Sequence, residues 1–216
     1  RIKYNLVSGI IYQVVLIVLS FLLPRLYLEN FGSEVNGVLS TIKQIFVYMF
    51  LLESGVGLAT TQALYKPVAE KNYGKVSSII SATHSYYCKI GYIYAAIVLL
   101  IETVYAFIVP TSIEPAVIFG IVVLTALPAL FSYFVQAKYR ILLEVDGRKY
   151  VITNSETVLQ LLSNIGKILV LILSNSLILI QLVYCILYLF QLAYIFIHAK
   201  RRYKWLDTKA EPNFEA

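Results

Sequence analysis

Apolar residues occur in long runs along this chain, and short polar segments separate the runs. A helix needs about 20 mostly apolar residues to cross the hydrocarbon core of a bilayer, and several runs approach that length. Residues that favour turns, chiefly Asn, Gly, Ser and Pro, lie between them, and connecting segments are expected at residues 26–36, 61–76 and 136–149. The pattern predicts an all-α polytopic membrane protein. Its six-span bundle fills residues 1–205, with spans at about 6–23, 38–58, 85–109, 115–135, 150–173 and 177–197.

The fifth predicted span, residues 150–173, differs from the others because polar side chains recur along one of its sides. At about 100° per residue they fall within an arc of about 100°. They are Thr153, Glu156, Gln160, Ser163, Asn164 and Lys167. Polar and charged groups in a membrane face a bundle interior or water, because contact with lipid is too unfavourable. We therefore expect this polar stripe to line a hydrated path that the other helices enclose.

The composition supports a membrane protein and argues against a soluble helical domain. Of the 216 residues, 59% are hydrophobic and 14% are charged, and the mean hydropathy is +0.76. A typical soluble domain has about 25% charged residues. The net charge of +6 comes from short clusters of Lys and Arg between apolar runs, without a continuous basic face. We therefore predict the bilayer as partner and no nucleic acid.

The distribution of cations predicts how the chain is oriented. One side of the predicted membrane receives nearly all of them: Arg1, Lys3, Lys66, Lys71, Lys75, Lys138, Arg140, Arg148, Lys149, Lys200, Arg201, Arg202 and Lys204. The connections on the other side hold Arg25 alone. Because cytoplasmic loops carry the excess of Lys and Arg, both ends of this segment are expected in the cytoplasm. We expect a multi-pass protein of the plasma (inner) membrane.

Three cations on different predicted spans fall at a similar depth in the outer half of the membrane. They are Arg25, Lys43 and Lys167, the last lying about 25 Å from the inner start of its span at a rise of about 1.5 Å per residue. One interpretation is a positive pocket for an anionic group such as a phosphate. The other is that each side chain extends separately to the outer headgroups.

Two further sets of charged residues have both a functional and a structural interpretation. Glu53 and Lys89 fall near the inner ends of adjacent spans, where they form either an inner gate pair or a static structural pair. Glu156 lies about two turns inside the fifth span, on the inner side of the polar stripe. It is either a proton or cation site or a hydrogen-bonded structural carboxyl group.

The chain has no recognisable catalytic constellation, so we expect no enzyme activity and no cofactor. A His/Asp/Ser set, a Gly-rich phosphate loop and paired aspartates in a loop are all missing from the sequence. Cys88 and Cys185 both lie in apolar segments, and His84 and His198 have no partners at ligand spacing. Neither a disulfide framework nor a metal site is expected.

Several short motifs along the chain together suggest a known family. The first is LLPRLYLENFGSEVNGVLS at residues 22–40, followed by LLESGVGL at 51–58. ALYKPVA at 63–69, IISAT at 79–83, KYRIL at 138–142 and YKW at 203–205 come after them. This set resembles the start of Wzx-type flippases of lipid-linked oligosaccharides, in the multidrug/oligosaccharidyl-lipid/polysaccharide exporter superfamily.

This resemblance implies a larger architecture and a transport function. Family members have about twelve to fourteen spans in two six-helix halves around a central cavity. Residues 1–205 resemble the amino-terminal half, and residues 206–216 would lead as a cytoplasmic segment to a second half. The implied activity moves a polyprenyl-pyrophosphate-linked oligosaccharide to the outer leaflet for cell-surface polysaccharide synthesis. Implied partners are the lipid-linked glycan, a polysaccharide polymerase and glycosyltransferases.

Two other functions stay open at this point. An ion-coupled antiporter of small molecules or drugs, from the same superfamily, would use a membrane carboxylate such as Glu156 or Glu102. A scaffold of a polysaccharide assembly complex, without transport, would pack the polar stripe against protein instead of water. The position of that stripe relative to protein and water therefore distinguishes the alternatives.

Overall fold

The computed structural model describes residues 2–108, 113–174, 176–207 and 210–212, except the side chains of 22–23, 50–54, 102, 104–108 and 136. These residues form helices, turns and loops, with no strand in the described ranges. In chain order the helices are α1 (Ile2–Ala69), α2 (Tyr73–Ile108), α3 (Pro115–Phe131), η1 (Ser132–Gln136), α4 (Ala137–Val145), α5 (Lys149–Leu173) and α6 (Leu177–Arg202). The predicted all-α class is confirmed.

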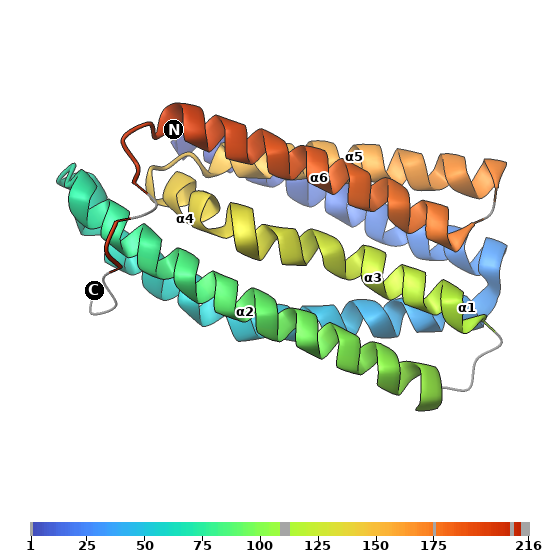
Figure 1. The fold of residues 1–216 in the computed structure, drawn as a ribbon. Coiled ribbons are helices and arrows are strands. Elements are labelled where there is room, and N and C mark those ends of the chain that lie inside the picture. Colours follow the sequence, from blue (N-terminus) through green and yellow to red (C-terminus); the bar gives the residue numbers. More distant parts are fainter. Residues whose placement is uncertain (1, 109–112, 175, 208–209, 213–216) are drawn as a thin grey trace.

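The helices run side by side as an elongated bundle, with the start of α1 and the end of α6 at the same end (Figure 1). Within the described residues, five apolar stretches are long enough to cross a membrane: Ile2–Met49, Tyr73–Ile101, Pro115–Val135, Lys149–Leu173 and Leu177–Arg202. The first of them contains a break that divides α1 into two helical limbs. The chain is therefore a multi-pass membrane protein, and the two limbs of α1 account for the first two predicted spans.

The break in α1 lies at Gly32, where φ is 78° and ψ is −179°. Only glycine adopts this backbone region readily, because a side chain there is strained. The sequence predicted a connecting segment over residues 26–36, but the structure reverses the chain at this single residue. Asn30 and Gly37 on either side are helical. The Asn30 side-chain amide donates to the Leu26 carbonyl at 2.8 Å, which satisfies one acceptor at the end of the first limb.

Gly32→Ala is expected to lower the free energy of unfolding by about 1–3 kcal/mol, the usual range for a residue forced into such a conformation. No heavy atom lies within 4 Å of a Cβ built on Gly32, so the effect would be backbone strain alone. Gly37→Ala is the matched control, since Gly37 has an equally open environment inside a helix. We expect Gly37→Ala to be neutral or stabilising. Equal thermal unfolding of the two variants in detergent would contradict a strained reversal at Gly32.

The polar segment predicted at residues 136–149 is mostly helical. A single π-helical turn, η1, follows α3 and leads directly into α4, and only residues 146–148 form a turn. The loop predicted at residues 61–76 also shortens, because α1 continues to Ala69 and α2 begins at Tyr73. Polar residues can lie near the ends of these helices, because water can reach their side chains there. The predicted polar segments therefore belong largely to helices, with short turns at residues 146–148 and between Ala69 and Tyr73.

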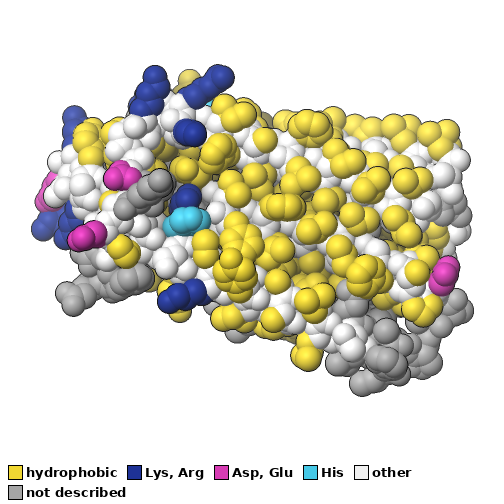
Figure 2. All heavy atoms as spheres, viewed as in Figure 1, with side chains coloured by type: hydrophobic (Ala, Val, Ile, Leu, Met, Phe, Trp, Pro, Cys, Tyr) yellow, Lys and Arg dark blue, Asp and Glu magenta, His cyan; other side chains and the backbone are white. Residues whose placement is uncertain are grey.

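Helix α5 packs chiefly against α1 on one side and α6 on the other. Gly166 permits the close approach of α6, because a Cβ at this position would lie 2.6 Å from Cγ1 of Val183. The outer surfaces of α1, α5 and α6 carry many exposed large apolar side chains. Figure 2 shows hydrophobic side chains over most of the visible face, with Lys and Arg gathered toward one end. We call this end, where α1 begins and α6 ends, the cation-rich end.

Candidate functional site

The polar stripe of α5 faces the interior of the bundle. Ser163 is fully buried, Asn164 is 2% exposed, and Thr153 is also buried. Residues on the opposite side of the same helix, such as Ile165 and Leu169, are more than half exposed. A soluble helix shows the reverse arrangement, with apolar residues inward. The burial pattern thus encloses polar groups within a membrane bundle.

At the cation-rich end of the stripe, Glu156 forms an ion pair with Arg140 of α4. The Arg140 and Glu156 side chains are 31% and 24% exposed, respectively, so the pair is largely removed from solvent. Tyr12 of α1 interacts electrostatically with both charges, and Tyr184 of α6 interacts with Glu156. Four helices therefore bring polar groups together here. Removing one partner of such a partly buried pair is expected to destabilise the protein, because the other charge is left uncompensated.

A cavity of about 260 Å³ lies beside this ion pair. Arg140 and Glu144 contribute charge to its wall, and Ser132 and Tyr133 of the π-helical turn contribute hydroxyl groups. Tyr188 of α6 also lines it. Single π-helical turns are frequent at functional sites because they re-aim the side chains that follow. The cavity and the ion pair together form one polar region at the cation-rich end of the stripe.

At the other end of the stripe, Lys167 lies over the ring of Tyr184, with its Nζ 5.1 Å from the ring centroid. This distance is within the range of a cation–π interaction. Lys167 also interacts electrostatically with Lys43 in the second limb of α1. Two like charges from different helices therefore face the same region, where an anion would relieve their repulsion. Tyr184 contacts the Lys167 end and interacts with Glu156 toward the other end.

Arg25, the third member of the predicted cationic pocket, has a different environment. Its side chain is 79% exposed and forms an ion pair with Glu29 at 2.8 Å, one helical turn away. Exposed pairs of this type contribute little stability, but they balance the charge of the cation locally. Of the three predicted cations, Lys43 and Lys167 thus interact with each other electrostatically, although Lys43 is exposed.

The predicted inner gate pair is not described in full. The side chain of Glu53 lies outside the described residues, as does that of Glu102. Lys89 is exposed on α2 and forms no ion pair with any described residue. The pairing of Glu53 with Lys89 stays a prediction.

Sequence reasoning missed Arg140, Tyr12 and Tyr184 as members of the interior site. Arg140 was assigned to a polar connection that determines orientation, whereas it follows the π-helical turn and lies in α4 between the buried residues Tyr139 and Ile141. That run of apolar residues, Ile141 to Leu143, was the available signal that the segment packs inside the protein. The two tyrosines carried no distinguishing signal in a chain with 18 of them.

In the described part of the chain, no three His, Cys, Asp or Glu side chains form a possible metal site. Comparison with known protein families, with curated proteins and with solved structures finds no match.

Proposed function

We propose that this chain is one half of a flippase that carries a polyprenyl-pyrophosphate-linked oligosaccharide across the plasma membrane. The glycan would pass from the inner to the outer leaflet by alternating access and supply cell-surface polysaccharide synthesis. The observation that carries the proposal is the enclosed polar stripe of α5, which leads to Lys167, where the exposed Lys43 of α1 is near enough to interact electrostatically with it. The sequence resemblance to Wzx-type flippases supports the same function.

The two lysines are suited to an anionic group that bears more than one charge. Arg140 is neutralised by Glu156, and Arg25 is neutralised by Glu29. Lys43 and Lys167 form no ion pair with any carboxylate in the described part of the chain. A pyrophosphate between them would form charge-assisted contacts with both ammonium groups. The rest of the cavity, including its second wall, would come from another six-helix half.

Closure near the middle of the stripe is compatible with alternating access. Ser163 and Asn164 are sealed from solvent between Glu156 and Lys167, so the polar path is interrupted here. The Asn164 side-chain amide donates to the Gln160 carbonyl at 2.5 Å, while its Oδ1 atom has no hydrogen-bond partner. An unpaired buried acceptor is unfavourable by about 1–3 kcal/mol. Separation of the helices would give this oxygen access to water or to a hydroxyl group of the glycan.

Cysteine accessibility distinguishes a transport path from a scaffold. In a background with Cys88→Ser and Cys185→Ser, we expect Ser163→Cys to react with a water-soluble thiol reagent during transport. Ile165→Cys is the matched control, because Ile165 is 54% exposed on the apolar side of α5 and would face lipid, where the thiolate rarely forms. The reaction rates are measured in intact membranes. If Ser163→Cys reacts no faster than Ile165→Cys, the stripe is packed against protein and the scaffold function is favoured.

The transport activity itself is tested with the full-length protein in proteoliposomes that contain a fluorescent polyprenyl-pyrophosphate-linked glycan. We expect loss of fluorescence from the inner leaflet when a quencher is added outside, at a rate above that of protein-free vesicles. The double variant Arg25→Gln/Glu29→Gln is a matched control and should transport normally, because this pair is exposed and balanced. Equal rates with and without protein would contradict the proposed flippase.

A second candidate, an ion-coupled antiporter of small molecules, is favoured by one observation. Glu156 is a partly buried carboxylate held by Arg140, and its protonation would release Arg140. This function predicts that Glu156→Gln abolishes transport while Lys167→Ala retains it. The flippase predicts a strong effect of Lys167→Ala. The two variants thus separate the candidates when transport is measured at matched protein levels.

By the positive-inside rule, we place the cation-rich end in the cytoplasm, with both ends of this segment there. The polysaccharide polymerase and the glycosyltransferases that extend or supply the glycan would then be partners at the membrane. This orientation puts Glu156 nearer the cytoplasm and Lys167 nearer the outer surface. Loading of the substrate would accordingly begin near Arg140 and Glu156.

A further inference from the structure

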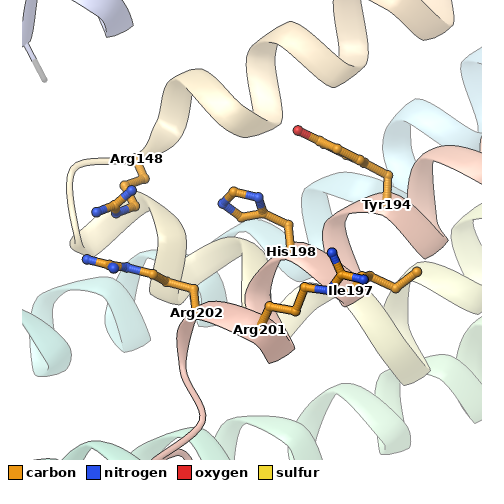
Figure 3. A pocket seen from close by; sticks show the side chains of 6 residues that line it. All are labelled: Arg148, Tyr194, Ile197, His198, Arg201 and Arg202. Atoms are coloured by element: carbon orange, nitrogen blue, oxygen red, sulfur yellow. The ribbon is translucent and has the colours of Figure 1, made fainter.

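Three arginines and one histidine line a hollow of about 370 Å³ at the cation-rich end, between the start of α5 and the end of α6. Arg148 precedes α5, and His198, Arg201 and Arg202 lie on the last turns of α6. Figure 3 shows side chains of α6 and of Arg148, just before α5, around this hollow, with the His198 ring between Arg148 and Tyr194. No carboxylate of the described residues lines it.

The hollow has more positive charge than the neighbouring residues balance. Arg148 is paired with Asp146 at 2.8 Å, but neither Arg201 nor Arg202 pairs with a carboxylate in the described part of the chain. The Nε2 atom of His198 is buried and lacks a hydrogen-bond partner. Topology alone requires Lys or Arg near this end, but it does not require a histidine nitrogen inside the same hollow. Such a set of donors is complementary to a phosphate group.

A second hollow, of about 320 Å³, continues from the first along the groove between α5 and α6. Tyr194 lines both, and the second is otherwise mainly apolar, with Val158, Leu162, Leu187 and Phe190 in its wall. Tyr194 and Leu187 are seven residues apart on α6, or about 10 Å along the helix. The groove thus has a cationic head at the end of the bundle and an apolar part that leads toward its middle.

This groove lies on the outer side of the bundle, away from the interior site. Val158 and Leu162 of α5 line it, and both are exposed and lie opposite the polar stripe by helical periodicity, whereas Leu159 forms its buried floor. On this side α5 and α6 would face lipid. A ligand in the groove would therefore come from the bilayer and not from the interior path.

We propose that the α5–α6 groove binds an anionic phospholipid of the surrounding bilayer. The phosphate of its headgroup lies among Arg148, Arg201, Arg202 and His198, and an acyl chain follows the apolar part past Tyr194. The charge of the hollow selects anionic over zwitterionic headgroups, because a zwitterionic headgroup brings a cation of its own to the arginines. The proposed lipid site does not depend on whether the interior path transports a glycan.

The test measures lipid binding to the full-length protein in detergent by native mass spectrometry, with phosphatidylglycerol compared with phosphatidylcholine. We expect preferential binding of phosphatidylglycerol, and a loss of at least about tenfold in affinity for Arg201→Gln/Arg202→Gln, since each cation near an anionic headgroup contributes measurably. Val158→Trp, which fills the apolar part from an exposed position, should also weaken binding. Lys75→Gln/Lys204→Gln is the control with the same change of charge outside the groove, and it should bind normally.

Several outcomes would overturn the proposal. Equal binding of the two phospholipids, or equal effects of the groove variant and the control variant, would show that no selective site exists. Displacement of phosphatidylglycerol by inorganic phosphate would show a headgroup site without an acyl groove. One-for-one displacement by a polyprenyl phosphate, at lower concentration than by phosphatidylglycerol itself, would assign the groove to that lipid instead of a bilayer phospholipid.

Discussion

Lys167→Ala is expected to reduce surface polysaccharide at least about tenfold at matched protein levels, because a hydrogen bond to a charged group contributes about 1.5–3 kcal/mol. Lys167 lacks a carboxylate partner among the described residues, and the proposed pyrophosphate would bind between it and Lys43, an exposed residue that also lacks one. Lys43→Ala should have an effect in the same direction. Lys167→Arg should retain part of the activity because it keeps the charge but changes the geometry of the donors.

Two controls separate a lost anion contact from a damaged helix interface. Tyr184→Phe keeps the aromatic ring that lies under Lys167 and should preserve the position of the lysine. Arg25→Ala removes an outer cation whose charge is already balanced by Glu29, so surface polysaccharide should stay near the normal level. Surface polysaccharide is measured in cells that lack the natural protein. Normal polysaccharide from Lys167→Ala would remove the anion pocket from the proposal.

Arg140→Gln is expected to lower the free energy of unfolding by about 2–4 kcal/mol, toward the range seen when a buried ion pair loses one partner. Glu156 would then remain charged in the interior between α1, α4 and α6 without its cation. Glu156→Gln should cause a similar loss for the reciprocal reason. The double variant Arg140→Gln/Glu156→Gln should be less unstable than the sum of the two single variants, because no uncompensated charge remains.

The Lys149–Glu144 pair is a matched control on the same two helices. Its atoms are 2.6 Å apart, but its side chains are 57% and 41% exposed. A solvent-exposed pair contributes about 0–1 kcal/mol, so the same double-mutant cycle should give a small coupling energy there. Chemical denaturation in detergent gives both values. Equal coupling energies for the two pairs would show that the burial of Arg140 and Glu156 does not strengthen their interaction.

The sequence by itself determined the helices and the direction in which each side of α5 faces. Helical periodicity is a local property, so the inward position of Ser163 and Asn164 and the outward position of Ile165 follow from the order of residues alone. The membrane class likewise follows from the length of the apolar runs, since a bilayer demands that length of every spanning helix. The turn region near residues 26–36 was also located, although not its reduction to Gly32.

Only the tertiary structure decided which charges meet. Arg140 and Glu156 lie on helices that the turn at residues 146–148 connects, and the π-helical turn before Arg140 changes the direction in which the following residues face. Lys43 and Lys167 are more than 100 positions apart in the sequence, whereas Arg25 pairs with its own neighbour Glu29. Similar depth in the membrane made all three cations equal candidates for one pocket. Packing selected among them, because depth depends on position along a helix, while contact depends on which helices adjoin and how each is rotated.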